Sequence, residues 1–335
     1  MTQTQISASG ARSGTPVPPR GPAGPAPLRT RLQLALAGLW LLDGLLQFQP
    51  YMFTKNFAVQ TILPVADGNP GWIAAPVTWS AKIIENHAVA TNTAFALIQV
   101  LLGLGIAYRP TRRHAIYCSA VWAGFVWYFG EGLGGLFTGQ ADPLTGAPGS
   151  ACVYLLAAIL LWPTRRTGPF PAAAWIGARA ARIVWSAFWA GLAGLTLLPA
   201  NRADGAFTDA LTGGMMSTGE PSWFTTLTEH ANRLIAGHDL GIAITLAVLL
   251  AVIAASVWLP QRELVQAGLV AAGVVGAVYW VFGQAFGMPF MGMATDPNTG
   301  PLLVLLAAAY WPVHGRGAVD AAEAATAAAA KGAAA

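Results

Sequence analysis

Eight apolar segments constrain the fold of this chain more than any other feature. They cover residues 31–50, 84–108, 115–137, 149–163, 182–200, 235–259, 264–288 and 300–313. Hydrophobic residues make up 55% of the chain and charged residues only 10%, whereas a soluble domain usually carries about 25% charged residues. Because so few charges cannot cover a water-facing surface, lipid is the expected solvent. The sequence therefore predicts an all-α integral membrane protein with eight transmembrane helices.

Basic and acidic residues divide between the two sides of this predicted membrane protein. Arginines cluster before the first segment, after the last, and in the connections after the second, fourth and sixth segments. The positive-inside rule places that side, with both termini, in the cytoplasm. Acidic residues gather on the other side, which should attract cations. We expect a multi-pass protein of a bacterial plasma (inner) membrane. Its basic residues lie at helix ends without interleaved aromatic residues, so nucleic acid is not an expected partner.

The two halves of the chain, 31–163 and 182–312, repeat each other. His87 and His238 are 151 positions apart (238 − 87 = 151), as are Arg31 and Arg182. Other matches follow in the same order: Trp127–Glu131 with Trp280–Gln284, Asp142–Gly146 with Asp296–Gly300, and Trp162–Pro163 with Trp311–Pro312. Each half crosses the membrane an even number of times, so the two repeats are parallel, related by an axis along the membrane normal.

The repeat gives the expected domain organisation. A Pro/Gly-rich tail, predicted to be disordered and cytoplasmic, is followed by a four-helix repeat, a cytoplasmic linker, a second four-helix repeat and an Ala-rich cytoplasmic tail. The respective ranges are 1–28, 29–166, 167–181, 182–314 and 315–335.

The fourth and eighth segments are too short to cross a bilayer alone. A helix of about 14 residues reaches only about 21 Å, against roughly 30 Å of hydrocarbon. Glycine-rich stretches precede both segments, at 130–149 and 283–300. Irregular backbone inside a membrane is tolerated only when it is buried in protein or lines a wet cavity. We therefore expect both stretches to be partly re-entrant and to form a binding site in the outer half of the bilayer.

Ionisable residues near these stretches are the candidates for binding a ligand or an ion. Glu131 matches Gln284 in the other half, and Asp43 lies inside the first segment. An ionisable group at membrane depth favours a functional role, although Glu131 could instead bind amides of the glycine-rich loop. Asp142 and Asp296 open D-P-x-T-G motifs. These motifs predict turns in which Thr or Asn caps the next helix, with cation coordination by the two carboxylates as the alternative.

Histidine and methionine residues are candidates for binding haem or metal. His87 and His238 open matching apolar segments, and the repeat could bring them together as axial ligands of a b-type haem or as ligands of a metal ion. The alternative is that each is an anchor at the membrane interface. Met288, Met291 and Met293 could bind Cu(I), although flexible gap-filling explains them as well. The two cysteines show no spacing typical of c-type haem, thioredoxin-like chemistry or zinc.

Each half resembles the DoxX-like family of four-helix membrane proteins. The resemblance rests on residues 31–46, RLQLALAGLWLLDGLL, and 92–105, NTAFALIQVLLGLG. It implies a four-helix unit and a link to quinone-coupled or redox-stress systems, but it transfers no catalytic motif. A fused pair of units departs from the family pattern.

Three functions remain open at this stage. The first is a membrane component of a redox system that works with a quinone or an electron-carrying partner protein. The second is a transporter or binding protein for a small solute or a cation such as copper. The third is an assembly or scaffold subunit without a ligand. Quinone, b-type haem and copper are the candidate cofactors, and whether the protein is an enzyme is left open.

Overall fold

The computed structural model describes residues 27–215 and 221–313, so nearly all of both predicted tails lies outside the described residues. This part of the chain is helical and contains no strand. Each of the eight apolar segments contains a helix. These helices are α1 (Leu28–Leu46), α3 (Ala88–Ala107), α4 (Arg112–Phe129), α5 (Ser150–Leu160), α7 (Ala178–Thr196), α10 (Asp239–Ser256), α11 (Arg262–Val278) and α12 (Thr299–Ala309).

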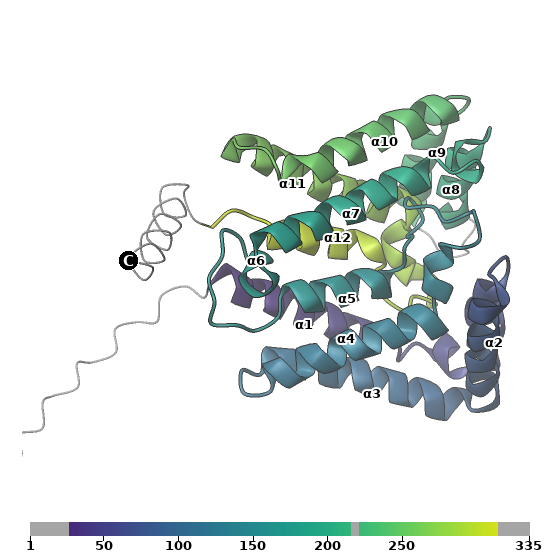
Figure 1. Cartoon of the computed structure of the whole chain (residues 1–335). Helices are drawn as coiled ribbons and strands as arrows, with labels where there is room; N and C mark the ends of the chain where they lie inside the picture. Colours follow the sequence, from purple (N-terminus) through teal and green to yellow (C-terminus); the bar gives the residue numbers. More distant parts are fainter. Residues whose placement is uncertain (1–26, 216–220, 314–335) are drawn as a thin grey trace, which may run out of the picture.

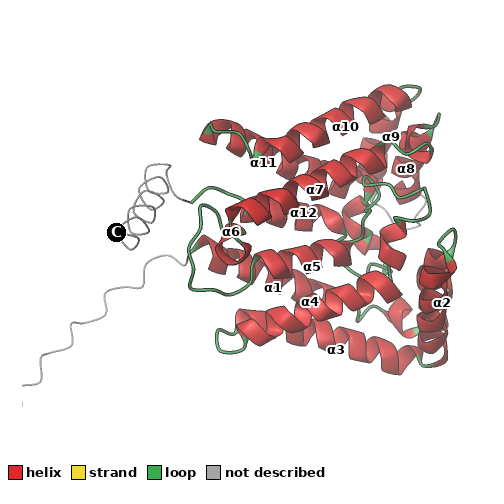
Figure 2. Ribbon diagram, viewed as in Figure 1, coloured by secondary structure: helices red, strands yellow, loops and turns green. Residues whose placement is uncertain are grey.

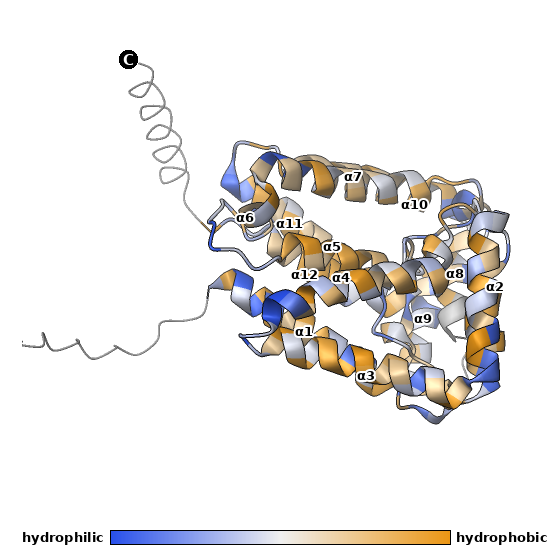
Figure 3. Cartoon of the chain, turned by 60° about the horizontal axis from the view of Figure 1, so that its bottom comes forward, coloured by the Kyte–Doolittle hydropathy of each residue, from blue (hydrophilic) through white to orange (hydrophobic). Residues whose placement is uncertain are grey.

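Within the described ranges, three helices are long and apolar enough to cross a membrane. They are α3, α10 and α11 together with the π-helical turn that extends it to Gly283. Large apolar side chains such as Leu101 and Val252 are exposed on these helices. Figure 3 shows hydrophobic residues along the helices, with more hydrophilic residues towards their ends. An apolar surface of this extent is expected of a protein that faces lipid.

The helices of the bundle lie roughly side by side (Figure 1). In the first half α1 packs on α3, and α4 packs on α5. In the second half α7 packs on α10, and α11 packs on α12. The short helices α5 and α12 contact each other in the middle of the bundle. The two halves therefore share one core, which includes Trp40 and Tyr154 from the first half and Trp185 and Tyr310 from the second.

Small residues bring the packed helices close together. A Cβ added at Gly103 of α3 would lie 2.8 Å from the carbonyl oxygen of Ala37 in α1. One added at Gly276 of α11 would lie 3.0 Å from the carbonyl oxygen of Gly300 in α12. Such contacts are typical of helix pairs that associate in lipid, where backbones approach through small residues.

The two ends of the bundle differ. The described chain enters α1 and leaves α12 at one end, where the short helix α6 (Ala173–Ile176) also lies (Figure 1). At the opposite end α2 (Gly71–Asn86) lies across the direction of the bundle, and α8 (Ala206–Met215) and α9 (Ser222–Ile235) lie at the same end. We call this second end the α2 end. Figure 2 shows that the loops gather at the two ends.

The structure corrects several predicted helix limits. The second apolar segment is divided at His87, which separates α2 from α3. The third was expected to extend to 137, but α4 stops at Phe129 because Gly132, Gly134 and Gly135 adopt positive φ angles. Positive φ is incompatible with a continuing right-handed helix. The seventh was expected to extend to 288, but its last π-helical turn ends at Gly283.

The fourth and eighth segments are short, as predicted. Helices α5 and α12 have 11 residues each, which corresponds to about 16 Å at 1.5 Å per residue. Both begin at the α2 end, directly after the glycine-rich stretches. These stretches line part of two cavities at the α2 end.

Candidate functional site: an acid-lined aromatic cavity

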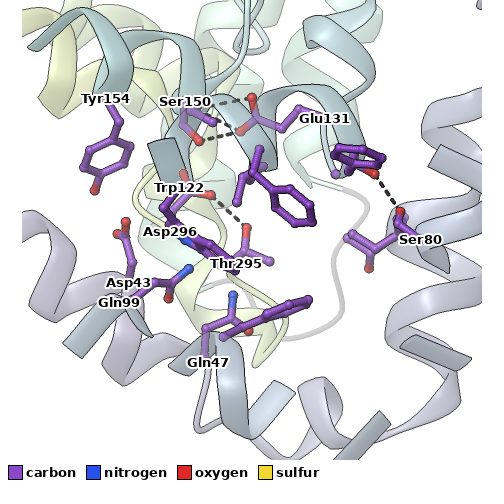
Figure 4. Close-up of a pocket in the computed structure, with 18 of the residues that line it drawn as sticks. Asp43, Gln47, Ser80, Gln99, Trp122, Glu131, Ser150, Tyr154, Thr295 and Asp296 are labelled. Atoms are coloured by element: carbon purple, nitrogen blue, oxygen red, sulfur yellow. Dashed lines mark hydrogen bonds between the residues drawn. The ribbon is translucent and has the colours of Figure 1, made fainter. Parts of the chain in front are cut away.

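A cavity of about 320 Å³ lies inside the first half, near the α2 end. We call it the inner cavity. Helices α1 to α5 and the π-helical turn Phe57–Ile62 line it. Thr295 and Asp296 reach it from the second glycine-rich stretch (Figure 4). The site is therefore built mainly from one half and completed by the other.

Aromatic rings form much of the wall of the inner cavity. Phe95, Trp122, Phe125 and Phe129 follow one another with ring centroids 5.6, 5.6 and 4.6 Å apart. On α1, the Trp40 ring stacks on Tyr154 at 4.2 Å, and its Nε1 donates a hydrogen bond to Ser119 Oγ at 2.8 Å. Rings held this way offer a flat, apolar surface to a planar or elongated ligand.

Buried polar atoms without partners face the same cavity. Asp43, Gln47 and Gln99 are only 2%, 4% and 8% exposed. In the described part of the chain, Asp43 Oδ1, Gln47 Oε1, Gln99 Oε1 and Trp122 Nε1 form no hydrogen bond. All four side chains line the inner cavity (Figure 4). Because buried polar atoms in folded proteins nearly always have a partner, these four atoms are candidates to bond a ligand or water in the inner cavity.

Glu131 connects the cavity wall to the start of α5. Its Oε1 accepts hydrogen bonds from Ser150 Oγ at 2.8 Å and from Ala151 N at 3.1 Å. A carboxylate in this place satisfies free N–H groups of the first helical turn and interacts favourably with the helix dipole. Glu131 therefore bonds the first turn of α5 rather than amides of the stretch 130–149 itself, and it also lines the inner cavity.

Gln284 makes the same arrangement at the start of α12. Its Oε1 accepts a hydrogen bond from Gly300 N at 3.0 Å, and its Nε2 donates one to Thr299 Oγ1 at 2.8 Å. The Gln284 side chain is 2% exposed and lines neither the inner cavity nor the vestibule described below. We conclude that Gln284 supports α12, whereas Glu131 both supports α5 and faces a cavity.

The two aspartates of the D-P-x-T-G motifs form turns, as predicted. Asp142 Oδ1 accepts a hydrogen bond from Leu144 N at 2.9 Å, and Asp296 Oδ1 accepts one from Asn298 N at 2.7 Å. Helix capping holds only in the second half, where Asn298 Oδ1 accepts a hydrogen bond from Thr299 N. Thr145 does not cap α5, because residues 147–149 separate its turn from the helix. Its hydroxyl donates to the Asp142 carbonyl oxygen instead.

A second cavity of about 410 Å³ adjoins the first, and we call it the vestibule. Both glycine-rich stretches line it, and the first contributes Asp142. Gln140 and Thr145 of that stretch are exposed, so the vestibule reaches the protein surface. Met288 and Met293 also line the vestibule, whereas Met291 lines neither cavity.

The backbone of these stretches is strained. Outside glycine, every described residue with a positive φ lies in them: Leu133, Ala285, Phe286, Met288 and Asn298. Such conformations cost about 1–3 kcal/mol each and cluster at functional sites. This strain is a second, independent feature that marks the α2 end as the place of a site.

The walls of the two cavities contain carboxylates but no basic side chains. Asp43, Glu131 and Asp296 line the inner cavity, and no Lys, Arg or His belongs to the walls of either cavity. In the described ranges, no group of three or more His, Cys, Asp or Glu side chains is close enough to hold a metal ion. The cavity therefore favours cations or neutral molecules over anions.

The structure does not bring His87 and His238 together. His87 lies between α2 and α3, and His238 lies just before α10. The beginnings of α3 and α10 are at opposite edges of the bundle (Figure 1). Both side chains are exposed, and His238 Nδ1 lies 2.9 Å from the carbonyl oxygen of Ala236. The two side chains therefore do not face each other within one chain, as the two axial ligands of a single haem would have to.

Sequence reasoning missed several residues of the inner cavity: Gln47, Gln99, Trp122, Tyr154 and Thr295. A signal existed for two of them, because the +151 offset of the repeat pairs Gln47 with Leu198 and Gln99 with Leu250. Polar residues in one half thus correspond to apolar residues in the other. Thr295 carries no such signal, because its contact crosses between the halves.

Comparison with protein families, curated proteins and solved structures finds no match for this chain.

Proposed function

We propose that the chain is an eight-helix membrane protein built from two parallel four-helix repeats of the DoxX-like kind. Supporting this are the equal order of helix packing in the two halves and the shared hydrogen-bond arrangement at α5 and α12. The helices α5 and α12 match in length as well. In this proposal the arginine-rich end is cytoplasmic in a bacterial inner membrane, and the α2 end faces outward.

We further propose that the inner cavity binds the head group of a quinol. The observation that carries this is the set of buried, unpartnered acceptor atoms on Asp43, Gln47 and Gln99. A quinol supplies two hydroxyl donors for them, and its ring fits against the aromatic wall. Its apolar tail suits a cavity between membrane helices. The protein would thus present the quinol to a separate electron-carrying partner.

Quinol binding can be measured by quenching of tryptophan fluorescence, because Trp40 and Trp122 line the cavity. The probe is a short-tailed benzoquinol analogue, kept reduced, with the purified protein in lipid nanodiscs. We expect Gln99→Leu to weaken binding by about 2- to 10-fold, because it removes a neutral hydrogen bond worth about 0.5–1.5 kcal/mol. Asp43→Asn should weaken binding by up to about tenfold, because it keeps an acceptor oxygen but replaces a charged acceptor with a neutral one. The oxidised quinone should bind more weakly than the quinol, because its carbonyls donate no hydrogen bonds.

Asp67→Asn is the control variant, because Asp67 is exposed and lines neither cavity. It should bind the quinol like the unchanged protein. Equal affinity in all variants, or a preference for the oxidised quinone, would contradict the proposal.

A second candidate function is binding or transport of a small organic cation. The observation that favours it is the set of three carboxylates without a basic residue in the cavity walls. Aromatic rings also attract cations through their faces. Tetraethylammonium tested in the same assay separates the candidates: a cation site would bind it and lose that binding in Asp43→Asn, whereas a quinol site would not bind it.

A further inference from the structure

The inner cavity and the vestibule share part of their walls. Five residues line both, namely Thr61, Glu131, Ser150, Thr295 and Asp296. From the first half, the Glu131 carboxylate lies between the two cavities, where Ser150 and Ala151 donate hydrogen bonds to it. From the second half, the Asp296 carboxylate lies between the same cavities, where Thr295 and Asn298 donate hydrogen bonds to it. A proton that passes from the vestibule to the inner cavity therefore passes these two groups.

The surroundings of Glu131 contain acids and no base. The titratable groups that face it are Asp43 on α1, Asp296 and Asp142 on the glycine-rich stretches, and Cys152 and Tyr154 on α5. Hydrogen bonds from Ser150 and Ala151 favour the charged form of Glu131, whereas burial without a counter-charge disfavours it, and more so when water leaves. A neutral ligand that displaces this water therefore favours the protonated form of the carboxylates.

Gln284 shows how a protonated Glu131 would fit its site. A protonated carboxyl has one acceptor oxygen and one O–H donor, and an amide likewise has one acceptor and a donor group. Gln284 accepts from Gly300 N and donates to Thr299 Oγ1. A protonated Glu131 can accept from Ala151 N and donate to Ser150 Oγ in the same way. Both charge states of Glu131 thus satisfy the start of α5, so a change of state does not require a change of fold.

From these features we infer that Glu131 is a proton-exchange residue between the vestibule and the inner cavity, and that a neutral quinol binds together with one proton taken up from the vestibule. This inference rests on the proposed function. In the step, an O–H bond forms on a Glu131 carboxylate oxygen as a hydronium ion in the vestibule loses its proton to become water. The reverse occurs when the ligand leaves. Glu131 then acts as a positioning and proton-exchange group, distinct from the acceptors that hold the ligand.

The sign of the pH dependence follows from this linkage. Because the bound state holds one more proton than the free state, affinity rises as the pH falls, by up to about tenfold per pH unit while Glu131 is ionised in the free protein. An organic cation would show the opposite sign, because it stabilises the charged carboxylates.

The test is calorimetry of the benzoquinol analogue in nanodiscs, at several pH values and in buffers with different ionisation enthalpies. We expect uptake of one proton by the unchanged protein. Glu131→Gln should bind at every pH with the affinity that the unchanged protein shows at low pH, without proton uptake. The Glu131→Gln variant should fold stably, because a glutamine, Gln284, already occupies the equivalent place in the second half. A thermal melt would check this. Unchanged pH dependence and proton uptake in Glu131→Gln would overturn the inference.

A second measurement does not need the ligand. Dicyclohexylcarbodiimide is apolar and adds to protonated carboxyl groups, first as an O-acylisourea that rearranges to a stable N-acylurea. Peptide mass spectrometry should find this adduct on Glu131, increasing as the pH falls, and not on the exposed Asp67. An adduct on Glu131 in a protein that does not bind the quinol would contradict the proposed function but leave the proton-exchange role in place. Quinol binding without any Glu131 adduct would reject the proton-exchange role alone.

Discussion

Replacing Gly149 with alanine should destabilise the protein strongly and displace Glu131 from the start of α5. Gly149 precedes α5 with φ +99°, and a Cβ there would overlap Glu131 Oε2 and contact Trp127. Its ψ is 145°, and this extended backbone with positive φ is essentially restricted to glycine and costs another residue about 1–3 kcal/mol. Loss of the helix-start contacts adds about 1–2 kcal/mol. We expect a total of about 3 kcal/mol or more, measured as a fall in the thermal unfolding temperature of the purified protein.

Two other glycines serve as matched controls for this variant. Gly139 also has a positive φ, +75°, but a Cβ there would meet nothing within 4 Å, so Gly139→Ala should lose only the conformational part. Gly124 lies inside α4 with open space around it, so Gly124→Ala should be neutral or slightly stabilising. A melting temperature of Gly149→Ala equal to that of Gly139→Ala would show that the contact with Glu131 contributes nothing.

Two glutamine-to-leucine variants should differ in their effect on stability: Gln284→Leu should destabilise the protein and Gln99→Leu should not. Gln99 and Gln284 are both buried, at 8% and 2% exposure. Gln284 satisfies Gly300 N and Thr299 Oγ1, so Gln284→Leu should cost about 1–3 kcal/mol by leaving buried polar groups without partners. Gln99 Oε1 has no partner in the described chain, so Gln99→Leu should leave the ligand-free protein unchanged or more stable while weakening quinol binding.

Comparing these two variants distinguishes a buried polar residue that stabilises the fold from one that binds a ligand. Thermal melts of both variants without ligand, and again with the benzoquinol analogue, check it. The ligand should raise the melting temperature of Gln284→Leu by as much as it raises that of the unchanged protein, and should raise that of Gln99→Leu much less. Equal destabilisation by both substitutions would mean that Gln99 belongs to the structural framework.

Much of the helical architecture was predictable, because it follows from apolar segments and glycine. Helix α12 occupies nearly the predicted range, and its shortness follows from the length of its apolar segment. The end of α4 was misplaced, because apolar residues such as Leu133 and Leu136 continue past it. Their pattern does not reveal that Leu133 adopts a positive φ of 56° among glycines that do the same.

Of the residues that line the site, mainly the ionisable ones could be predicted from the sequence. Glu131 and Asp43 stand out as ionisable residues in apolar surroundings, whereas Gln99 is neutral and was not sought as a ligand-binding residue. Matching positions in a repeat also do not imply proximity: His87 and His238 precede α3 and α10, and these helices lie at opposite edges of the bundle. Asp296 reaches the cavity of the other half through tertiary packing that no local pattern encodes.

A cryo-electron microscopy map of the protein, purified from native membranes with mild detergent, tests the central claim most directly. The account predicts ring-shaped density between the aromatic walls of the inner cavity, with its polar end within hydrogen-bond distance of Asp43 and Gln99. A collapsed cavity in which neighbouring side chains bond to Asp43 and Gln99, or one that holds only ordered water, would contradict it.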